Sequence, residues 1–182
     1  MHQTKPPEEL LQCYDQNEVP TTGKPQSEVK QIPARWWFAV ARVWLVNDAG
    51  EILCSRRAET LSGNPGKWQT YFGGHVAEGE SILLTAQREL QEEAGISKPL
   101  SEFHLIQKDR IDEKKVFFES YAVRFNGQPS DLHFSDQEVM EAKWFSMENY
   151  ASEKEAHAEQ WCNSCTEENQ AAIREWLATS QR

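Results

Sequence analysis

The chain of 182 residues contains no apolar run long enough to span a bilayer, and its N-terminus lacks the apolar core of a secretion signal. Cysteines are few, and the four present form no framework typical of small secreted domains. Basic residues are also scarce, with 19 Lys and Arg against 29 Asp and Glu and a formal net charge of −10. These absences argue against a membrane span and against binding of a nucleic acid polymer, and they predict a cytoplasmic protein.

The length and composition predict one domain with a single core and short extensions. Hydrophobic residues make up 38% of the chain and charged residues 26%, which is near the norm for globular proteins. Because the net charge is negative, an anionic substrate would have to be met locally by a metal ion and a few basic side chains. The expected partner is therefore a small molecule, and the sequence leaves the oligomeric state open.

The most informative stretch is a glycine-containing loop that runs into a helix ending near residue 95. Gly73, Gly74 and Gly79 permit backbone turns that a β-carbon would resist. Ser81 is placed to cap the start of the helix, and Gly95 to end it in the left-handed conformation. Between these caps, apolar residues recur at helical spacing and predict one buried stripe, formed by Leu83, Ala86, Leu90 and Ala94.

Three carboxylates share another face of this helix. Glu89, Glu92 and Glu93 stand at positions i, i+3 and i+4, and each like-charged pair costs roughly 0.2–0.5 kcal/mol on a helix. A helix C-terminus favours cations, and only Arg88 is near enough in sequence to offset the three charges. Oxygen ligands at this density suit Mg²⁺ or Mn²⁺, which often bind substrate phosphates as well. The alternative is a solvated acidic face in an acidic chain.

The same stretch matches the Nudix box, G-x5-E-x7-R-E-U-x-E-E-x-G-U with U aliphatic, at every defined position. The matching residues are Gly74, Glu80, Arg88, Glu89, Leu90, Glu92, Glu93, Gly95 and Ile96. A chance match of this kind is on the order of one in a million or rarer. The chain therefore resembles the Nudix hydrolases. This resemblance implies an α/β fold, a Nudix-type α/β/α sandwich with a mixed sheet, over about residues 34–178.

The resemblance also implies an activity, namely metal-dependent hydrolysis of a phosphoanhydride bond in a nucleoside diphosphate linked to another moiety. Water would attack a phosphorus atom next to one or more Mg²⁺ or Mn²⁺ ions. The expected metal ligands are Glu89, Glu92, Glu93 and the carbonyl of Gly73, and Glu92 or Glu93 would double as the base. By family analogy, supporting roles fall to Gly74, Glu80 and Arg88.

In many Nudix proteins an acidic residue from the opposite side of the fold acts as the base or as a further metal ligand. Glu138, which precedes a predicted strand at 139–146, resembles that position, and Glu141 is its rival. The alternative for either residue is an exposed carboxylate at the end of a strand.

Four other residues are candidates for binding the substrate. Arg56 and Arg57 end a predicted strand at 51–57 and point to opposite faces, so at most one of them faces the acidic helix or a bound phosphate. Trp68 and Tyr71, in a short predicted strand, are placed to stack on a base, although aromatic residues are more often part of a core.

The remaining elements follow from apolar patterns and turns. Strands are predicted at 36–46, 51–57, 68–72, 103–111, 116–125 and 139–146, and the first two are expected to form a hairpin with both faces of the first covered. Residues 1–33 resemble the N-terminal extension of the isopentenyl-diphosphate-isomerase-like Nudix subgroup and are expected to form a small hairpin packed on the domain.

The end of the chain is predicted to be helical. Ser164 and Glu167 fit a capping box, and the apolar stripe expected after them comprises Ala171, Ile173, Trp176 and Leu177. Cys162-x-x-Cys165, with His157 upstream, suggests a zinc or redox site, but a single Cys-x-x-Cys lacks the second pair of ligands. The alternative is that the two cysteines pack near the helix start.

Two other functions compete with hydrolysis. An isomerase of isopentenyl diphosphate would need a catalytic cysteine where this chain has Gly73. It would also need histidine ligands near Trp36 and Trp37, where there are none, although His75 matches one histidine of that motif. A catalytically silent nucleotide-binding Nudix domain would have no need to keep the electrostatic cost of three clustered glutamates. The substrate itself cannot be read from the sequence, because selectivity depends on loops.

Overall fold

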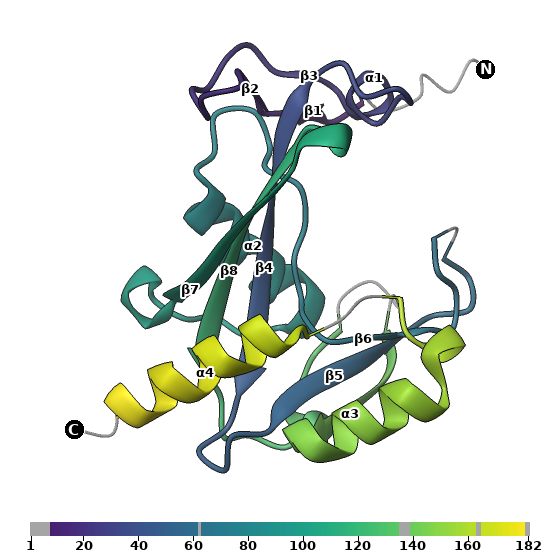
Figure 1. Cartoon of the computed structure of the whole chain (residues 1–182), viewed down its shortest axis with the longest axis vertical. Coiled ribbons are helices and arrows are strands. Elements are labelled where there is room, and N and C mark those ends of the chain that lie inside the picture. The colour runs from purple at the N-terminus through teal and green to yellow at the C-terminus, as the bar shows by residue number, and fades with distance from the viewer. Residues whose placement is uncertain (1–7, 62, 135–138, 163–164, 181–182) are drawn as a thin grey trace.

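The computed structural model describes residues 8–61, 63–134, 139–162 and 165–180. A seven-stranded mixed sheet forms its centre (Figure 1). Five strands follow one another in the order β6 (Trp68–Gln69), β5 (Ile52–Arg57), β4 (Trp37–Val46), β8 (Val116–Arg124) and β7 (His104–Ile111). Two more strands join this path, β2 (Cys13–Tyr14) beside β4 and β9 (Val139–Phe145) beside β5. The pairing of β4 with β8 is parallel and the other pairings are antiparallel.

Helices cover both faces of this sheet. The α-helices are α1 (Gln26–Val29), α2 (Ile82–Ala94), α3 (Met147–Ala156) and α4 (Glu167–Thr179), and the short 3₁₀ helices are η1 (Leu100–Glu102), η2 (Asp112–Lys114), η3 (Pro129–Asp131) and η4 (Ala158–Gln160). Among the described residues, none of these helices combines the length and apolar character that a membrane crossing requires.

Strand β4 is the element on which both halves of the core are built. Its side chains alternate between the two faces of the sheet. Ala41, Val43 and Leu45 pack in one cluster with the buried residues of α2, whereas Trp44 and Val46 pack in another with residues of α3 and α4. This arrangement confirms the predicted α/β sandwich and the prediction that both faces of this strand are covered.

Strand β5 leaves β4 almost at once. The expected hairpin exists only at its closed end, where Val46 pairs with Ile52, and β5 then pairs along its length with β9 (Figure 1). The segment 68–75 connects the diverging strands, because β6 pairs with β5 while Phe72 and His75 form bridges to β4. This crossing brings Gly73 and Gly74 beside the middle of β4.

The N-terminal segment packs against the end of the sheet. Strand β1 (Leu10–Leu11) pairs with β3 (Lys24–Pro25), and β2 pairs with β4. Leu11, Cys13 and Val29 are buried together there. The division of the chain into an extension at 1–33 and a domain at 34–178 stays a prediction.

The C-terminal helix differs from the sequence prediction in two respects. The expected cap, Ser164, lies outside the described residues, and Thr166 caps α4 instead, with its hydroxyl accepting from the N–H of Asn169. Ile173, Trp176 and Leu177 are buried as predicted. Ala171, however, is exposed, since it lies about 200° around the helix from Ile173 at 100° per residue.

Candidate active site

The helix α2 starts and ends where the sequence predicts. The Ser81 side chain accepts a hydrogen bond from the N–H of Leu84, and Gly95 ends the helix with φ 70°. Ala86, Leu90 and Ala94 are fully buried against the sheet, and Leu83 packs beside them partly exposed. This anchoring fixes the rotation of α2, so that its acidic residues face the loop carrying Gly73 and Gly74.

One guanidinium holds three carboxylates together at this helix. Arg88 donates from Nε to Glu80 at 3.1 Å, and from one terminal nitrogen to both Glu89 and Glu92 at 2.9 Å. Thr85 adds a hydroxyl donor to Glu80 at 2.8 Å. Burial alone would raise the pKa of Glu80, but these bonds and the charge of Arg88 outweigh it and lower that pKa.

Glu89 lies in a drier place than its neighbours. Its side chain is 14% exposed, whereas that of Glu92 is 52% exposed. Burial raises the pKa of the Glu89 carboxyl, although the charge of Arg88 and its hydrogen bond act in the opposite direction. A carboxylate in this position gains from any additional positive charge that reaches it.

Replacing Arg88 with methionine is expected to destabilise the protein by about 1–3 kcal/mol, because Glu80 and Glu89 would keep their partial burial and lose their charged donor. Urea unfolding at neutral pH measures this loss. Arg174→Met, at an exposed position on α4, is the matched control and should change stability by less than about 0.5 kcal/mol. Equal losses in the two variants would contradict this role of Arg88.

Two adjacent glycines of the loop, Gly73 and Gly74, allow it to pack closely against β4 and α2. The N–H of Gly73 donates to Glu93 at 2.8 Å. A β-carbon on Gly73 would lie 2.0 Å from the carbonyl oxygen of Ala41, and one on Gly74 would lie 2.3 Å from a carboxylate oxygen of Glu89. The two glycines therefore let the loop backbone fit between β4 and the acidic end of α2.

A cavity of about 420 Å³ opens beside this contact. Its lining includes Glu93, Gly73 and Gly74 together with Arg57 and Tyr71. Basic and acidic side chains thus face one hollow of the size expected for a small ligand.

Of the two neighbouring arginines, only Arg57 lines this cavity. Arg56 donates to the carbonyl of Gly66 at 2.9 Å and lies 3.9 Å from Glu59. This agrees with the prediction that at most one of the two faces the acidic helix, although the pairing of β5 with β9 shifts register between Arg56 and Arg57.

The two aromatic candidates are separated in a similar way. Tyr71 lines the cavity, but Trp68 is only 8% exposed and packs against Phe145 and Trp161 in the core. The structure therefore does not place Trp68 at the site, because its ring packs in the core against Trp161, the residue that follows η4.

Several cavity residues were missed as site candidates for the hydrolase, among them Lys30 and His75. Lys30 lies 43 positions before Gly73, and no local pattern connects them. Burial, and secondarily the charge of Lys30, lower the pKa of His75 to about 4, so this imidazole is neutral at pH 7. The sequence did single out His75, but only through the isomerase motif.

The remaining predicted residues divide as follows. Glu138 lies outside the described residues, and its rival Glu141 pairs with Lys143 on β9. Cys162 lines the cavity, whereas Cys165 is buried in the core, where its N–H donates to Tyr150. Across the described parts of the chain, no three His, Cys, Asp or Glu side chains are grouped to hold a metal ion. The described structure thus gives no support to a zinc site at the two cysteines.

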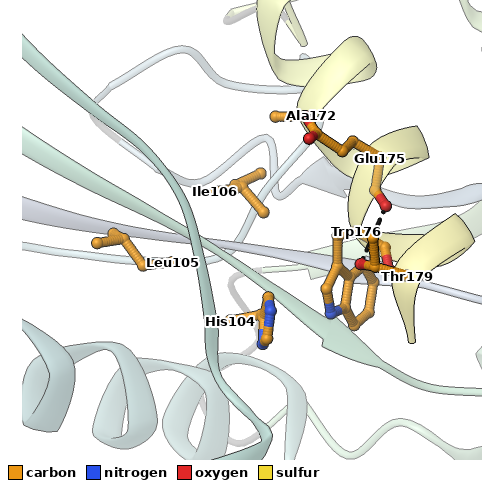
Figure 2. A pocket seen from close by; sticks show the side chains of 7 residues that line it. All are labelled: His104, Leu105, Ile106, Ala172, Glu175, Trp176 and Thr179. Atoms are coloured by element: carbon orange, nitrogen blue, oxygen red, sulfur yellow. Dashed lines mark hydrogen bonds between the residues drawn. The ribbon is translucent and has the colours of Figure 1, made fainter. Parts of the chain in front are cut away.

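A second hollow lies elsewhere, between β7 and α4, with a volume of about 230 Å³. Figure 2 shows His104 and Trp176 facing each other there, with their ring centroids 5.9 Å apart. Glu175 is the one carboxylate in its lining, and the lining contains no arginine or lysine. This hollow lacks the clustered charges of the cavity beside α2.

Comparison with known proteins agrees with the geometry. The family model of the NUDIX domain matches residues 35–162. The chain is 33% identical over 85 residues to Nudix hydrolase 3 of Arabidopsis thaliana, covering 46% of this chain and 11% of that one. It is 28% identical over 127 residues to an uncharacterized Nudix hydrolase of Listeria monocytogenes, covering 70% and 74%. The match thus spans only a small part of the Arabidopsis protein and about three quarters of the Listeria one.

A further relative carries a different name, and a solved structure has the same fold. The chain is 29% identical over 145 residues, or 76% of each chain, to an isopentenyl-diphosphate Delta-isomerase of Paenarthrobacter aurescens. A crystal structure of a Deinococcus radiodurans protein superposes with a TM-score of 0.68 at 17% identity, covering 96% of this chain and 100% of that one. The matched family model, together with the complete box on α2, shows that this chain belongs to the Nudix family.

Proposed function

We propose that this protein hydrolyses a phosphoanhydride bond in a nucleoside diphosphate derivative with the help of a divalent cation. The observation that carries the proposal is a single cavity lined by Glu93, by Gly73 and Gly74, and by Arg57. An acidic end for a metal ion and a basic side chain for phosphate are the two features that such a reaction requires.

In their described positions the carboxylates of α2 are not grouped around an ion, but their donor type is the one that a hard cation such as Mg²⁺ or Mn²⁺ prefers. Glu89, Glu92, Glu93 and the carbonyl of Gly73 supply oxygen donors, and glycine at position 74 leaves no side chain between Glu89 and the loop. Arg88 and the N–H of Gly73 now hold these carboxylates, so they would have to turn away from these contacts to bind the ion. When bound, the ion would neutralise phosphate charge and acidify a water molecule.

The chain's own residues would then do the positioning and the proton transfer. Arg57 is held by the carbonyl of Gly63 at 3.0 Å and by Gln69 at 3.1 Å, so its guanidinium is preoriented at the cavity, where it would bind a phosphate oxygen. Tyr71 would contact the organic part of the substrate. Glu92 or Glu93 would accept the proton of the attacking water, and Glu138 is the further candidate for this role.

The purified protein is expected to release phosphate-containing products from one or more members of a panel of dinucleotides, sugar nucleotides and nucleoside triphosphates. Release should require Mg²⁺ or Mn²⁺, because the carboxylates alone repel the substrate. Chromatography of the products with each ion, and with a chelator, measures this dependence. Equal release in chelator would contradict metal-dependent hydrolysis, and no release from any panel member would favour a silent binding domain.

The second candidate is isomerisation of isopentenyl diphosphate. It is favoured by the Paenarthrobacter relative and by the position of His75 in the cavity. Gly73 stands against it, because the residue lining the cavity there carries no thiol. Incubation with isopentenyl diphosphate followed by NMR distinguishes the two functions, since appearance of the dimethylallyl isomer would reverse this ranking.

A further inference from the structure

A second, larger cavity adjoins the candidate active site. Its volume is about 560 Å³, and it shares Lys30 and His75 with the cavity beside α2. His75 lines both cavities. Its ring stacks on that of Phe38, which lines the second cavity, with the ring centroids 5.7 Å apart. Because they share Lys30 and His75, the cavity beside α2 and the second cavity can be occupied by different parts of one ligand.

The wall of the second cavity comes from the N-terminal segment. Apolar side chains at 29–34 and Phe38 make most of it, namely Val29, Ile32, Pro33, Ala34 and Phe38. Ile32 is 97% exposed, the highest value of any large apolar side chain in the described chain. Residues 29–34 also precede the stretch that matches the family model, which begins at residue 35. We refer to Val29, Ile32, Pro33 and Ala34 as the apolar wall.

The chemistry changes sharply between the two cavities. The cavity beside α2 contains Glu93 and Arg57, whereas the apolar wall offers aliphatic side chains. Polar residues also line the second cavity, namely Lys30, Gln31, His75, Glu113 and Lys114. A group placed against the aliphatic side chains gains by leaving water.

We propose that the apolar wall binds an uncharged, hydrocarbon-rich group attached to the substrate's diphosphate, and that Lys30 contacts the diphosphate where the two cavities meet. This proposal rests on the proposed function, because the cavity beside α2 must hold the diphosphate. It narrows the substrate class to diphosphate derivatives with one mostly apolar end. A ribose and base placed against Val29, Pro33 and Ala34 would leave hydrogen-bonding groups unpaired, which such a wall disfavours.

Binding of analogues that cannot be hydrolysed tests this assignment without requiring turnover. Three probes share a P–C–P linkage: methylenediphosphonate, its monohexyl ester and α,β-methylene-ADP. Titration calorimetry with Mg²⁺ gives the affinity of each for the full-length protein. The hexyl ester is expected to bind at least about tenfold more tightly than the unsubstituted probe, because its chain leaves water at the wall. The nucleoside probe should gain less.

The gain from the hexyl chain should disappear in Ile32→Asp, which places a charge on the wall. The exposure of Ile32 makes this change compatible with folding. Ala34→Trp, which fills the cavity, should have the same effect. The matched control is Leu105→Asp on β7, where a leucine that is 46% exposed lines the hollow in Figure 2, and this variant should keep the full gain. A gain from the hexyl chain that is retained in both wall variants overturns the proposal.

Lys30→Met separates the contact with diphosphate from the contact with the apolar group. It should weaken all three probes by about the same factor, roughly fivefold, and leave the gain from the hexyl chain intact. Lys98→Met, at a surface pair with Glu102, is the control and should change none of the affinities. Unchanged binding of all probes in Lys30→Met would refute the role of Lys30.

The test of the apolar wall and the test of the proposed hydrolysis can fail independently of each other. Metal-dependent hydrolysis of the nucleotide panel without any gain from the hexyl chain would refute the wall and leave the proposed function in place. A gain from the hexyl chain without hydrolysis of any diphosphate would refute the proposed reaction and keep the binding site.

Discussion

Glu93→Gln should lower the turnover number by at least about two orders of magnitude while leaving the fold intact. Glu93 accepts the N–H of Gly73 and lines the cavity, so its carboxylate contacts the loop and is also placed to meet a ligand. The amide of glutamine has nearly the same size, and its oxygen can still accept from Gly73. What is lost is the negative charge, on which both metal binding and proton transfer depend.

Steady-state kinetics with the best substrate of the nucleotide panel, across a series of Mg²⁺ concentrations, measure this effect. If saturating Mg²⁺ restores the rate, Glu93 acts mainly in binding the ion, and a rate that stays low assigns it to the chemical step as well. Glu153→Gln, an exposed glutamate on α3, is the matched control and should be indistinguishable from the wild type. Near-normal turnover of Glu93→Gln at all Mg²⁺ concentrations would refute the assignment of the site.

Gly73→Ala should produce the largest loss of stability of any single methyl addition at the site, about 3 kcal/mol or more. Its β-carbon would lie 2.0 Å from the Ala41 carbonyl oxygen, and the residue has φ 149°, which side-chain-bearing residues rarely adopt. Since Ala41 is in the buried strand β4, the loop would have to move instead of the strand. That movement would also break the bond from Gly73 to Glu93.

Thermal and urea unfolding measure the stability, and the panel assay measures the activity of whatever remains folded. Gly63→Ala is the control, because a β-carbon there meets nothing within 4 Å although Gly63 lines the same cavity. It should change stability by less than about 0.5 kcal/mol. A Gly73→Ala protein as stable as Gly63→Ala would contradict the described contact with β4.

The sequence predicted the parts of the site that depend on neighbours in the chain. The caps at Ser81 and Gly95, the buried stripe of α2 and the patch of three glutamates all follow from spacing within one helix. The prediction that at most one of Arg56 and Arg57 would face the acidic helix also used only neighbouring residues, and Arg57 alone lines the cavity. Local periodicity was sufficient in these cases because each prediction concerns residues of one element.

The parts that failed depend on contacts between distant elements. The predicted hairpin of the first two long strands is present at its closed end, but beyond Ile52 strand β5 pairs with β9, which is far away in the sequence. Trp68 could have stacked on a base, although a core position was favoured, and its contacts with Phe145 and Trp161 place it in the core. Lys30 could not be found at all, since its place at the cavity depends on how residues 8–33 fold back onto the sheet.

The arrangement around Arg88 has a consequence for how the protein would acquire a cation. In the described state the helix already carries its own counter-ion, so an incoming divalent ion enters by exchange and must compete with a tethered guanidinium for Glu89 and Glu92. Its apparent affinity then reflects the difference between two sets of bonds. Because of this competition, the divalent ion binds to the helix more readily when a phosphate-bearing ligand supplies further oxygen donors to it.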